Sequence, residues 1–231
     1  CAMAPTVAGS FTLRGVVHLA LGQADAALKD LDEALRLDPA DVDARLDRAG
    51  VLAAGGRDAD ALSDLADLDG RLPPQAPERR DMGGLYEQLD QPAKALVEWN
   101  DWIAAHRDEV DLDRVLHSRC RARTLLGTEL REAQDDCDRA IAARPDEGAY
   151  YDSRGWLELR ESRPQAARAD FEHSLKLHPG EAWSLYGRGL ARQQLGEDAA
   201  AQADLAAARK ADPKVEARIL ALRLAAAPAA R

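Results

Sequence analysis

Two short stretches near opposite ends of the chain share one design and decide the fold: Leu21-Gly22 followed by Ala27-Leu28-Lys29-Asp30-Leu31, and Leu195-Gly196 followed by Ala201-Gln202-Ala203-Asp204-Leu205. Alanines recur between them at a step of 34 residues: Ala27, Ala61 and Ala95, then Ala133, Ala167 and Ala201. A fixed period of this length indicates an array of stacked structural repeats, in which each repeat buries its apolar face against its neighbours.

Three further columns of residues follow the same period, with about three extra residues, 110–112, before the fourth repeat. A small column contains Gly15, Ala49, Gly83, Cys120, Gly155 and Gly189, and a bulky column contains Leu31, Leu65, Trp99, Cys137, Phe171 and Leu205. A proline column contains Pro39, Pro73, Pro145, Pro179 and Pro213. Small residues let two antiparallel helices touch, bulky ones fill the layer between them, and proline ends the second helix. The columns therefore predict helix-turn-helix repeats.

Composition agrees with a helical protein and excludes several classes of function. Hydrophobic residues make up 46% of the chain but aromatic residues only 4%, so alanine and leucine, both strong helix formers, supply most of the apolar surface. The formal net charge of −10 disfavours non-specific binding to nucleic acid or to an anionic membrane. The sequence has no apolar run long enough to span a bilayer.

The columns resemble those of the tetratricopeptide repeat family over nearly the whole chain. The resemblance implies an all-α, right-handed α-solenoid of about six helix-turn-helix repeats and a C-terminal capping helix. We predict a tether over 1–7, repeats 1–3 over 8–109, repeats 4–6 over 110–215, and the capping helix with its tail over 216–231. The apolar residues expected in the cap are Ile219, Leu220, Leu222 and Leu224. The alternative is a helical bundle that is not a solenoid.

An arginine precedes the small column and an aspartate precedes the bulky column in five of the six repeats. The five pairs are Arg14–Asp30, Arg48–Asp64, Arg119–Asp136, Arg154–Asp170 and Arg188–Asp204. We predict bidentate ion pairs that join the two helices of one repeat, or one repeat to the next. Repeat 3 has Met82 and Glu98 at these positions and is expected to lack the pair. Solvated surface charge is the alternative interpretation.

No motif in the sequence points to catalysis or to a cofactor. Neither GxxxxGK[ST] nor GxGxxG occurs, so no phosphate-binding loop is expected. The five histidines form no metal-ligand set such as HExxH: His18, His106, His117, His173 and His178. We therefore predict that the chain is not an enzyme and binds no metal or cofactor. A catalytic domain in a longer parent chain is the alternative.

The three cysteines bear on the cellular compartment. Cys120 and Cys137 occupy the small and bulky columns of one repeat and face each other, so they can form a disulfide, which would require an oxidising compartment. Two buried thiols are the alternative. Cys1 begins the chain as the lipid-bearing cysteine begins a mature bacterial lipoprotein, which predicts lipidation at Cys1 and a periplasmic or membrane-anchored protein. A domain boundary and a cytoplasmic protein remain the alternative.

The family resemblance implies a scaffold that binds a peptide or protein segment along a concave groove lined by the first helices of successive repeats. The alternative is a structural subunit, monomeric or weakly dimeric through its last helix, or the repeat portion of a larger exported protein that carries an enzyme. Units that clamp chaperone tails in this family use lysines and asparagines on groove helices. Asn100 is the only asparagine and belongs to a second helix, so that activity is not expected.

We predict the binding site on the groove face of repeats 4–6, where basic and aromatic residues recur at helical spacing. The candidate residues are Arg114, His117, Arg121, Asp152, Trp156, Arg160, Trp183, Tyr186, Leu190 and Gln193. Arginine and large aromatic residues dominate binding energy at interfaces, and this set favours a partner segment with acidic and apolar side chains. The alternative is that Trp156, Trp183 and Tyr186 pack as ordinary core. Repeats 1 and 2 offer a small, bland surface with Thr12, Val16, Leu19, Leu46, Gly50 and Ala53.

Overall fold

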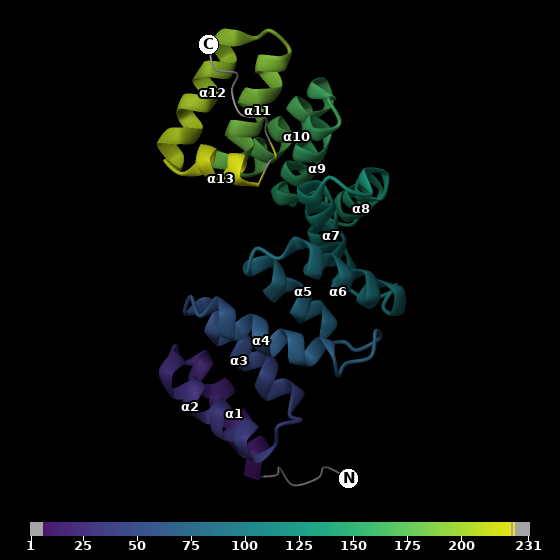
Figure 1. Ribbon diagram of the computed structural model, residues 1–231. Coiled ribbons are helices and arrows are strands. Elements are labelled where there is room, and N and C mark those ends of the chain that lie inside the picture. The colour runs from purple at the N-terminus through teal and green to yellow at the C-terminus, as the bar shows by residue number, and fades with distance from the viewer. Residues whose placement is uncertain (1–6, 223, 225–231) are drawn as a thin grey trace. The chain divides into compact units, whose positions relative to one another are not determined.

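The computed structural model describes residues 7–222 and 224, and the regular elements in this part of the chain are thirteen α-helices (Figure 1). Twelve of them form consecutive pairs: α1 (Val7–Ala20) with α2 (Ala24–Leu37), α3 (Val42–Ala54) with α4 (Asp58–Asp69), α5 (Arg79–Gln88) with α6 (Pro92–Ala105), α7 (Leu112–Leu126) with α8 (Leu130–Ala143), α9 (Gly148–Arg160) with α10 (Pro164–Leu177), and α11 (Ala182–Gln194) with α12 (Asp198–Ala211). A single helix, α13 (Val215–Ala221), follows. The all-α architecture of paired helices is the one that the repeat columns predict.

Small and bulky columns meet inside each helix pair. A Cβ atom built on Gly15 would lie 3.0 Å from Leu31 Cγ, and one built on Gly189 would lie 2.8 Å from Leu205 Cγ. At Gly83 the same atom would come within 2.3 Å of the Trp99 indole. A larger residue in the small column would therefore push the two helices apart, which is the physical reason for the periodic glycines.

The turns inside the repeats depend on backbone that favours glycine. Gly22 and Gly196 link α1 to α2 and α11 to α12 with φ angles of 71° and 76°. A residue with a Cβ atom is strained in this left-handed region, whereas glycine adopts it readily. The paired Leu-Gly motif in the sequence therefore marks the reversal of chain direction within a repeat.

The predicted arginine–aspartate pairs join the two helices of each of five repeats. In all five, the arginine Nε and Nη2 atoms donate to the two carboxylate oxygens at 2.6–2.8 Å. Arg48 also donates to Asp32, and Arg154 to Asp138, at 2.8 and 2.7 Å, so these two arginines bridge to the preceding repeat as well. Ion pairs within one repeat and ion pairs between successive repeats, the two arrangements that the sequence left open, are therefore both present.

Repeat 3 lacks that pair, as predicted, but it has a substitute. Arg79 stands one helical turn before Met82 and donates from Nη1 to Glu98 at 2.7 Å. Its Nε and Nη2 atoms donate to the carbonyl oxygens of Pro73 and Leu72. Arg79 and Glu98 are both buried. The guanidinium therefore fixes the proline-rich approach to α5, a helix of only 10 residues.

The chain divides into two compact units, Cys1–Trp102 and Ile103–Arg231, which we call the N-terminal and C-terminal units. One buried cluster of the N-terminal unit gathers Leu31, Ala34, Leu35, Ala44 and Val51, with Phe11, Leu19 and Leu28 packed against it. One buried cluster of the C-terminal unit surrounds Trp156 and Phe171 and continues to Ile219 in α13. None of the described helices has the length and apolar character needed to cross a membrane.

The predicted capping helix is present but short. Val215 and Ile219 are fully buried, and α13 contacts both α11 and α12. Tyr186 donates from its hydroxyl to Glu216 at 3.0 Å, which fixes α13 against α11. Leu220 and Leu222 are only half-buried. The rest of the predicted cap and tail, and the predicted tether with Cys1, lie largely outside the described residues.

Candidate functional site

A cavity of about 300 Å³ lies among α7, α9 and α11, the first helices of repeats 4–6. Its lining combines apolar, aromatic and ionisable side chains: His117, Arg121, Thr124, Leu125, Ala149, Asp152, Ser153, Trp156, Ser174, His178, Glu181, Trp183 and Leu224. A concave, mostly apolar site with a few convergent polar groups is the usual form of a binding pocket.

Helical spacing and one cap bring the polar groups together. His117 and Arg121 are four residues apart on α7, and Asp152 and Trp156 are four residues apart on α9, so each pair shares a helix face. Glu181 is the N-cap of α11, and its carboxylate accepts the backbone N–H of Ser184 at 2.6 Å. This cap fixes the first turn of α11 beside the cavity.

Two glycines allow α9 and α11 to close on one aromatic ring. A Cβ atom on Gly155 would lie 2.8 Å from the Phe171 ring, and one on Gly187 would lie 2.3 Å from it. Phe171 in turn meets Trp156 edge-on, with ring centroids 5.4 Å apart, and Trp156 meets Trp183 edge-on at 6.2 Å. The aromatic wall of the cavity therefore continues directly into the core of the unit.

Asp152 is one of two carboxyl groups in the polar lining. It accepts a hydrogen bond of 2.6 Å from the Ser184 hydroxyl, which also contacts Ser174 Oγ at 2.9 Å. Burial raises the pKa of Asp152 to about 7, although the Ser184 hydrogen bond and the Arg121 charge oppose the shift. The indole N–H of Trp156 adjoins this carboxyl group but reaches hydrogen-bond geometry with no protein acceptor. Near neutral pH, Asp152 therefore exists both as the acid and as the carboxylate.

His117 is neutral at physiological pH. Burial and the positive charge of Arg121 lower the pKa of its imidazole to about 4. Its Nε2 atom lies 2.8 Å from Ser153 Oγ, and its ring lies 4.6 Å from the ring of Tyr150. Arg121 therefore supplies the positive charge that α7 contributes to the cavity lining.

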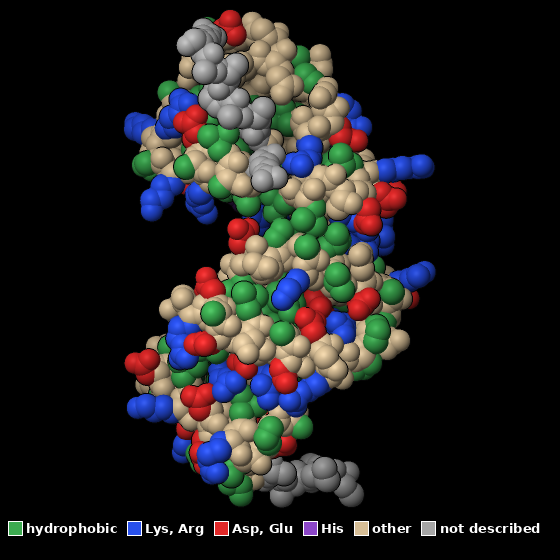
Figure 2. All heavy atoms as spheres, viewed as in Figure 1, with side chains coloured by type: hydrophobic (Ala, Val, Ile, Leu, Met, Phe, Trp, Pro, Cys, Tyr) green, Lys and Arg blue, Asp and Glu red, His purple; other side chains and the backbone are tan. Residues whose placement is uncertain are grey.

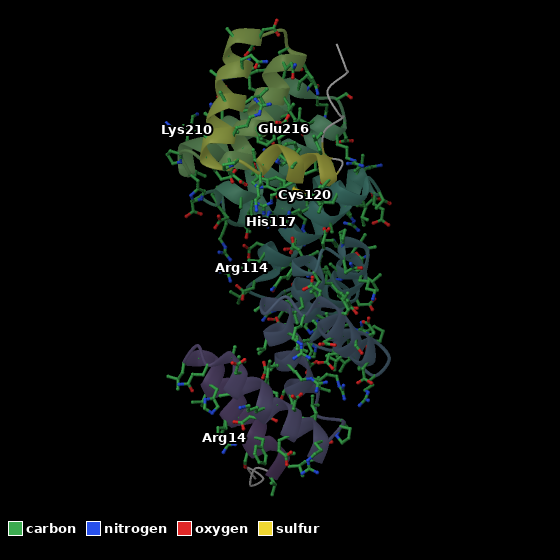
Figure 3. The ribbon with its side chains drawn as sticks, turned by 60° about the vertical axis from the view of Figure 1, so that its left-hand side comes forward. Arg14, Arg114, His117, Cys120, Lys210 and Glu216 are labelled. Atoms are coloured by element: carbon green, nitrogen blue, oxygen red, sulfur yellow. A yellow bond between two sulfur atoms is a disulfide. The ribbon has the colours of Figure 1, made fainter. Side chains whose placement is uncertain are left out.

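The structure brings five of the ten predicted groove residues to this cavity: His117, Arg121, Asp152, Trp156 and Trp183. Arg114 is exposed on α7 and lies outside the lining (Figure 3). The guanidinium of Arg160 instead lies against the turn at Gly127. Leu190 packs on the core cluster, and Gln193 is exposed.

Two of the three aromatic residues predicted for the groove are instead packed in the core, which is the alternative that the sequence left open. Trp156 is 3% exposed and Tyr186 is 4% exposed. The Phe171 side chain covers Trp156, and α13 covers Tyr186 through the Glu216 hydrogen bond. Trp183 is only half-buried, so of the two tryptophans in the cavity lining, Trp156 and Trp183, it is the one that a partner can reach more directly.

Sequence reasoning missed the lining residues that do not come from groove-facing positions of the first helices. Ser174 and His178 belong to the end of α10, Glu181 to the turn before α11, and Leu224 to the segment after α13. Thr124 had a detectable signal, because it stands seven residues after His117 on the same face of α7. Ser174 and Leu224 had none, because their approach depends on tertiary packing.

Cys120 and Cys137 are joined in a disulfide whose Cα atoms lie 5.6 Å apart. Both residues are fully buried, and the bond ties α7 to α8 beside the cavity-lining face of α7. Cys1 lies outside the described residues. Within residues 7–222 and 224, no group of three or more His, Cys, Asp or Glu side chains is arranged to hold a metal ion.

Comparison with known proteins identifies the repeats. A family model described as tetratricopeptide repeat matches residues 12–77 and 153–216. The human mitochondrial import receptor subunit TOM70 is 28% identical over 197 residues, a match that covers 81% of this chain and 27% of that protein. The chain thus spans about a quarter of the length of that relative.

Solved structures show the same fold at low sequence identity. PilW, described as a widely conserved type IV pilus biogenesis factor, is 17% identical with a TM-score of 0.73, covering 94% of this chain and all of that chain. A tetratricopeptide repeat protein from Parabacteroides merdae is 20% identical with a TM-score of 0.64, covering 94% of this chain and 83% of that chain. Since the family model matches more than half of the sequence and the helix pairs repeat its architecture, the chain belongs to the tetratricopeptide repeat family.

Proposed function

We propose that this chain is a non-catalytic scaffold that holds a segment of another protein at the cavity formed by α7, α9 and α11. The observation that carries the proposal is the convergence of Arg121, Asp152 and Trp183 from three successive repeats on one cavity. Repeats of this family generally form protein–protein interaction modules, and a segment lying across three first helices would contact all three side chains.

The chemistry of the cavity favours a segment with acidic and apolar side chains. Arg121 can pair with a carboxylate of the partner, while Trp183 and Leu125 offer apolar surface. Asp152 opposes an acidic partner less than an ordinary aspartate would, because its pKa of about 7 leaves it partly protonated at neutral pH. Repulsion from Glu181 remains, and it favours an acidic group placed toward α7.

The compartment is a second part of the proposal. A buried disulfide between α7 and α8 is typical of a protein that folds under oxidising conditions, which supports a periplasmic or other exported location. Lipidation of Cys1 would attach such a protein to a membrane surface. Mass spectrometry of the N-terminal peptide from the native host measures this modification, and an unmodified Cys1 would remove the anchor from the proposal.

The experiment is partner capture by the full chain and its variants, with crosslinking to map the contact. Arg121→Glu and Trp183→Ala should each abolish capture while circular dichroism stays helical. Arg114→Glu is the matched control, because it makes the same charge change on the same helix outside the cavity. Trp156→Ala is unsuitable, since it would open a cavity in the core. Full capture by folded Arg121→Glu and Trp183→Ala variants would refute the site.

The alternative function, an assembly subunit that pairs through its last helix, rests on less. The fully buried side chains of α13 face its own unit, and the leucines at this end of the described chain that a second copy could contact, Leu220 and Leu222, are half-buried. Light scattering distinguishes the two functions. A stable dimer that Leu220→Ser dissociates would favour assembly.

A further inference from the structure

The N-terminal unit has a groove of its own, of about 780 Å³, on the first helices α1, α3 and α5 and the start of α2. Three of the six residues that the sequence assigns to a bland surface line it, namely Leu19, Leu46 and Gly50. The full lining is Leu19, Ala24, Asp25, Leu28, Leu46, Asp47, Gly50, Val51, Ala54, Gly55, Arg57, Arg80, Asp81, Gly84 and Leu85. We call this surface the acidic groove.

The floor of the acidic groove is apolar and unfilled. Leu19, Leu46 and Leu85, from three different helices, are each half-buried. A Cβ atom on Gly84 would meet no atom within 4 Å, and one on Gly50 would meet only Leu85 Cδ2, at 3.8 Å. Glycines at these positions therefore keep the floor open, whereas the glycines of the small column are in contact with bulky side chains.

The unit that contains this floor carries a large excess of negative charge. The N-terminal unit contains 10 Lys and Arg against 19 Asp and Glu, a net formal charge of −9, whereas the C-terminal unit contains 21 against 22, a net charge of −1. Nearly all of the net negative charge of the chain thus belongs to the N-terminal unit. Acidic side chains are scattered over the face of that unit shown in Figure 2.

The groove lining itself has three aspartates against two arginines. Its two arginines are paired, Arg57 with Asp60 at 2.6 Å and Arg80 with Asp81 at 3.2 Å. Asp47 is half-buried in the lining, and burial together with three nearby carboxylates, Asp43, Asp41 and Asp81, raises its pKa. Burial is the larger cause of the shift, and the smaller part that comes from the three carboxylates reflects a negative local potential, which a cation would relieve.

We propose that the acidic groove binds the apolar face of a cationic amphipathic segment from a partner protein. Leucine-like side chains of the segment would lie on the floor of Leu19, Leu46 and Leu85, and its lysines or arginines would approach Asp25 and Asp47. This surface is separate from the cavity of the C-terminal unit, so the inference does not rest on the proposed function. It assigns the chain a second partner chemistry, opposite in charge to the first.

The test uses a designed helical peptide with leucine at every third or fourth position and lysine elsewhere, and a matched peptide with glutamate in place of lysine. Binding to the full chain is measured by fluorescence anisotropy. We expect the leucine–lysine peptide to bind, binding to weaken as salt is raised, and the leucine–glutamate peptide not to bind.

Two matched pairs of variants locate the binding. A Cβ atom on Gly84 meets no neighbour, so Gly84→Leu places its side chain over the open floor and should reduce affinity at least about tenfold, whereas Gly84→Ala should leave it unchanged. Both substitutions favour the helix over glycine, so a folding defect is not expected. Asp47→Asn should weaken binding by about two- to fivefold, while Asp58→Asn, the same charge change at an exposed site outside the groove, should not.

Several outcomes would overturn the inference. Retention of the leucine–lysine peptide by folded Gly84→Leu would place its binding elsewhere. Equal weakening by Asp47→Asn and Asp58→Asn would reduce it to general charge attraction. Equal binding of the leucine–glutamate peptide would show that the groove does not select a cationic partner. A dimer that Gly84→Leu dissociates in light scattering would assign the groove to a second copy of this chain.

Discussion

The Arg154→Met substitution tests whether the arginine–aspartate pairs stabilise the repeats. Arg154 donates to both oxygens of Asp170 at 2.8 and 2.7 Å, and to Asp138 at 2.7 Å. The side chains of Arg154 and Asp170 are 23% and 10% exposed. Methionine keeps much of the aliphatic volume but leaves the Asp170 carboxylate without its main partner. The cost of the substitution therefore comes from a largely buried charge that has lost its compensation.

The burial of the pair sets the expected magnitude. Removing one partner of a fully buried ion pair costs about 3–5 kcal/mol, and Asp170 retains some contact with water, so we expect about 2–3 kcal/mol. In a chain of this size each kcal/mol lowers the melting temperature by about 2–4 °C. Arg154→Met should therefore melt roughly 4–12 °C below the parent chain.

Thermal unfolding followed by circular dichroism measures the effect, and Arg36→Met is the control. Arg36 pairs with Glu33 in the same bidentate geometry, but the two side chains are 66% and 35% exposed. An exposed pair is solvated and screened, so Arg36→Met should leave the melting temperature unchanged. An unchanged melting temperature for Arg154→Met would refute the stabilising role of the pairs. An equal fall in both variants would refute the dependence on burial.

Three further predictions concern single features of the fold. Burial and the neighbouring Asp69 raise the pKa of Glu98 to about 8. Between about pH 5 and pH 8, the folded protein therefore keeps a proton on Glu98 that the unfolded chain has released. Its stability in urea should therefore fall as the pH rises from about 5 to 8, and Glu98→Gln should flatten that profile; an unchanged profile would contradict the assignment. Replacing Cys120 and Cys137 by alanine should cost about 3 kcal/mol, and thiol titration of the denatured, unreduced parent should find neither sulfur free. Ile219→Ala should cost about 2–4 kcal/mol because its side chain is fully buried in the cap, and a neutral result would show that α13 does not stabilise the unit.

The fold could be predicted because the repeat fixes both members of each contact. Gly15 and Leu31 meet in α1 and α2, and Gly189 and Leu205 meet in the same way in α11 and α12, so one geometry explains both. The contact of Arg79 with Glu98 in repeat 3 could not be found by the same reasoning. Arg79 stands one helical turn away from the arginine column, and only the path of the chain after Pro73 brings it to Glu98.

The candidate site could be predicted only in part, because helical spacing gives the face of one helix and not what lies against it. The spacing on α7 correctly puts His117 and Arg121 on one side, and both line the cavity. The same rule cannot tell that Phe171, from a second helix, covers Trp156, or that Glu216 from α13 reaches Tyr186. Those contacts depend on the angle between successive helix pairs, which no periodic column encodes.

The residues that build the repeat and the residues that choose a partner occupy different positions, and this separation explains the two surfaces. The alanine, small and bulky columns face the inside of a helix pair, so the same residue types recur in them from α1 to α12. Groove-facing positions have no such constraint. In the N-terminal unit they combine Gly84 and Leu46 with Asp47, and in the C-terminal unit they combine Arg121 with Trp183. The scaffold can therefore offer an acidic groove in one unit and a cavity with a half-buried arginine and an aromatic wall in the other, without any change in the repeat itself.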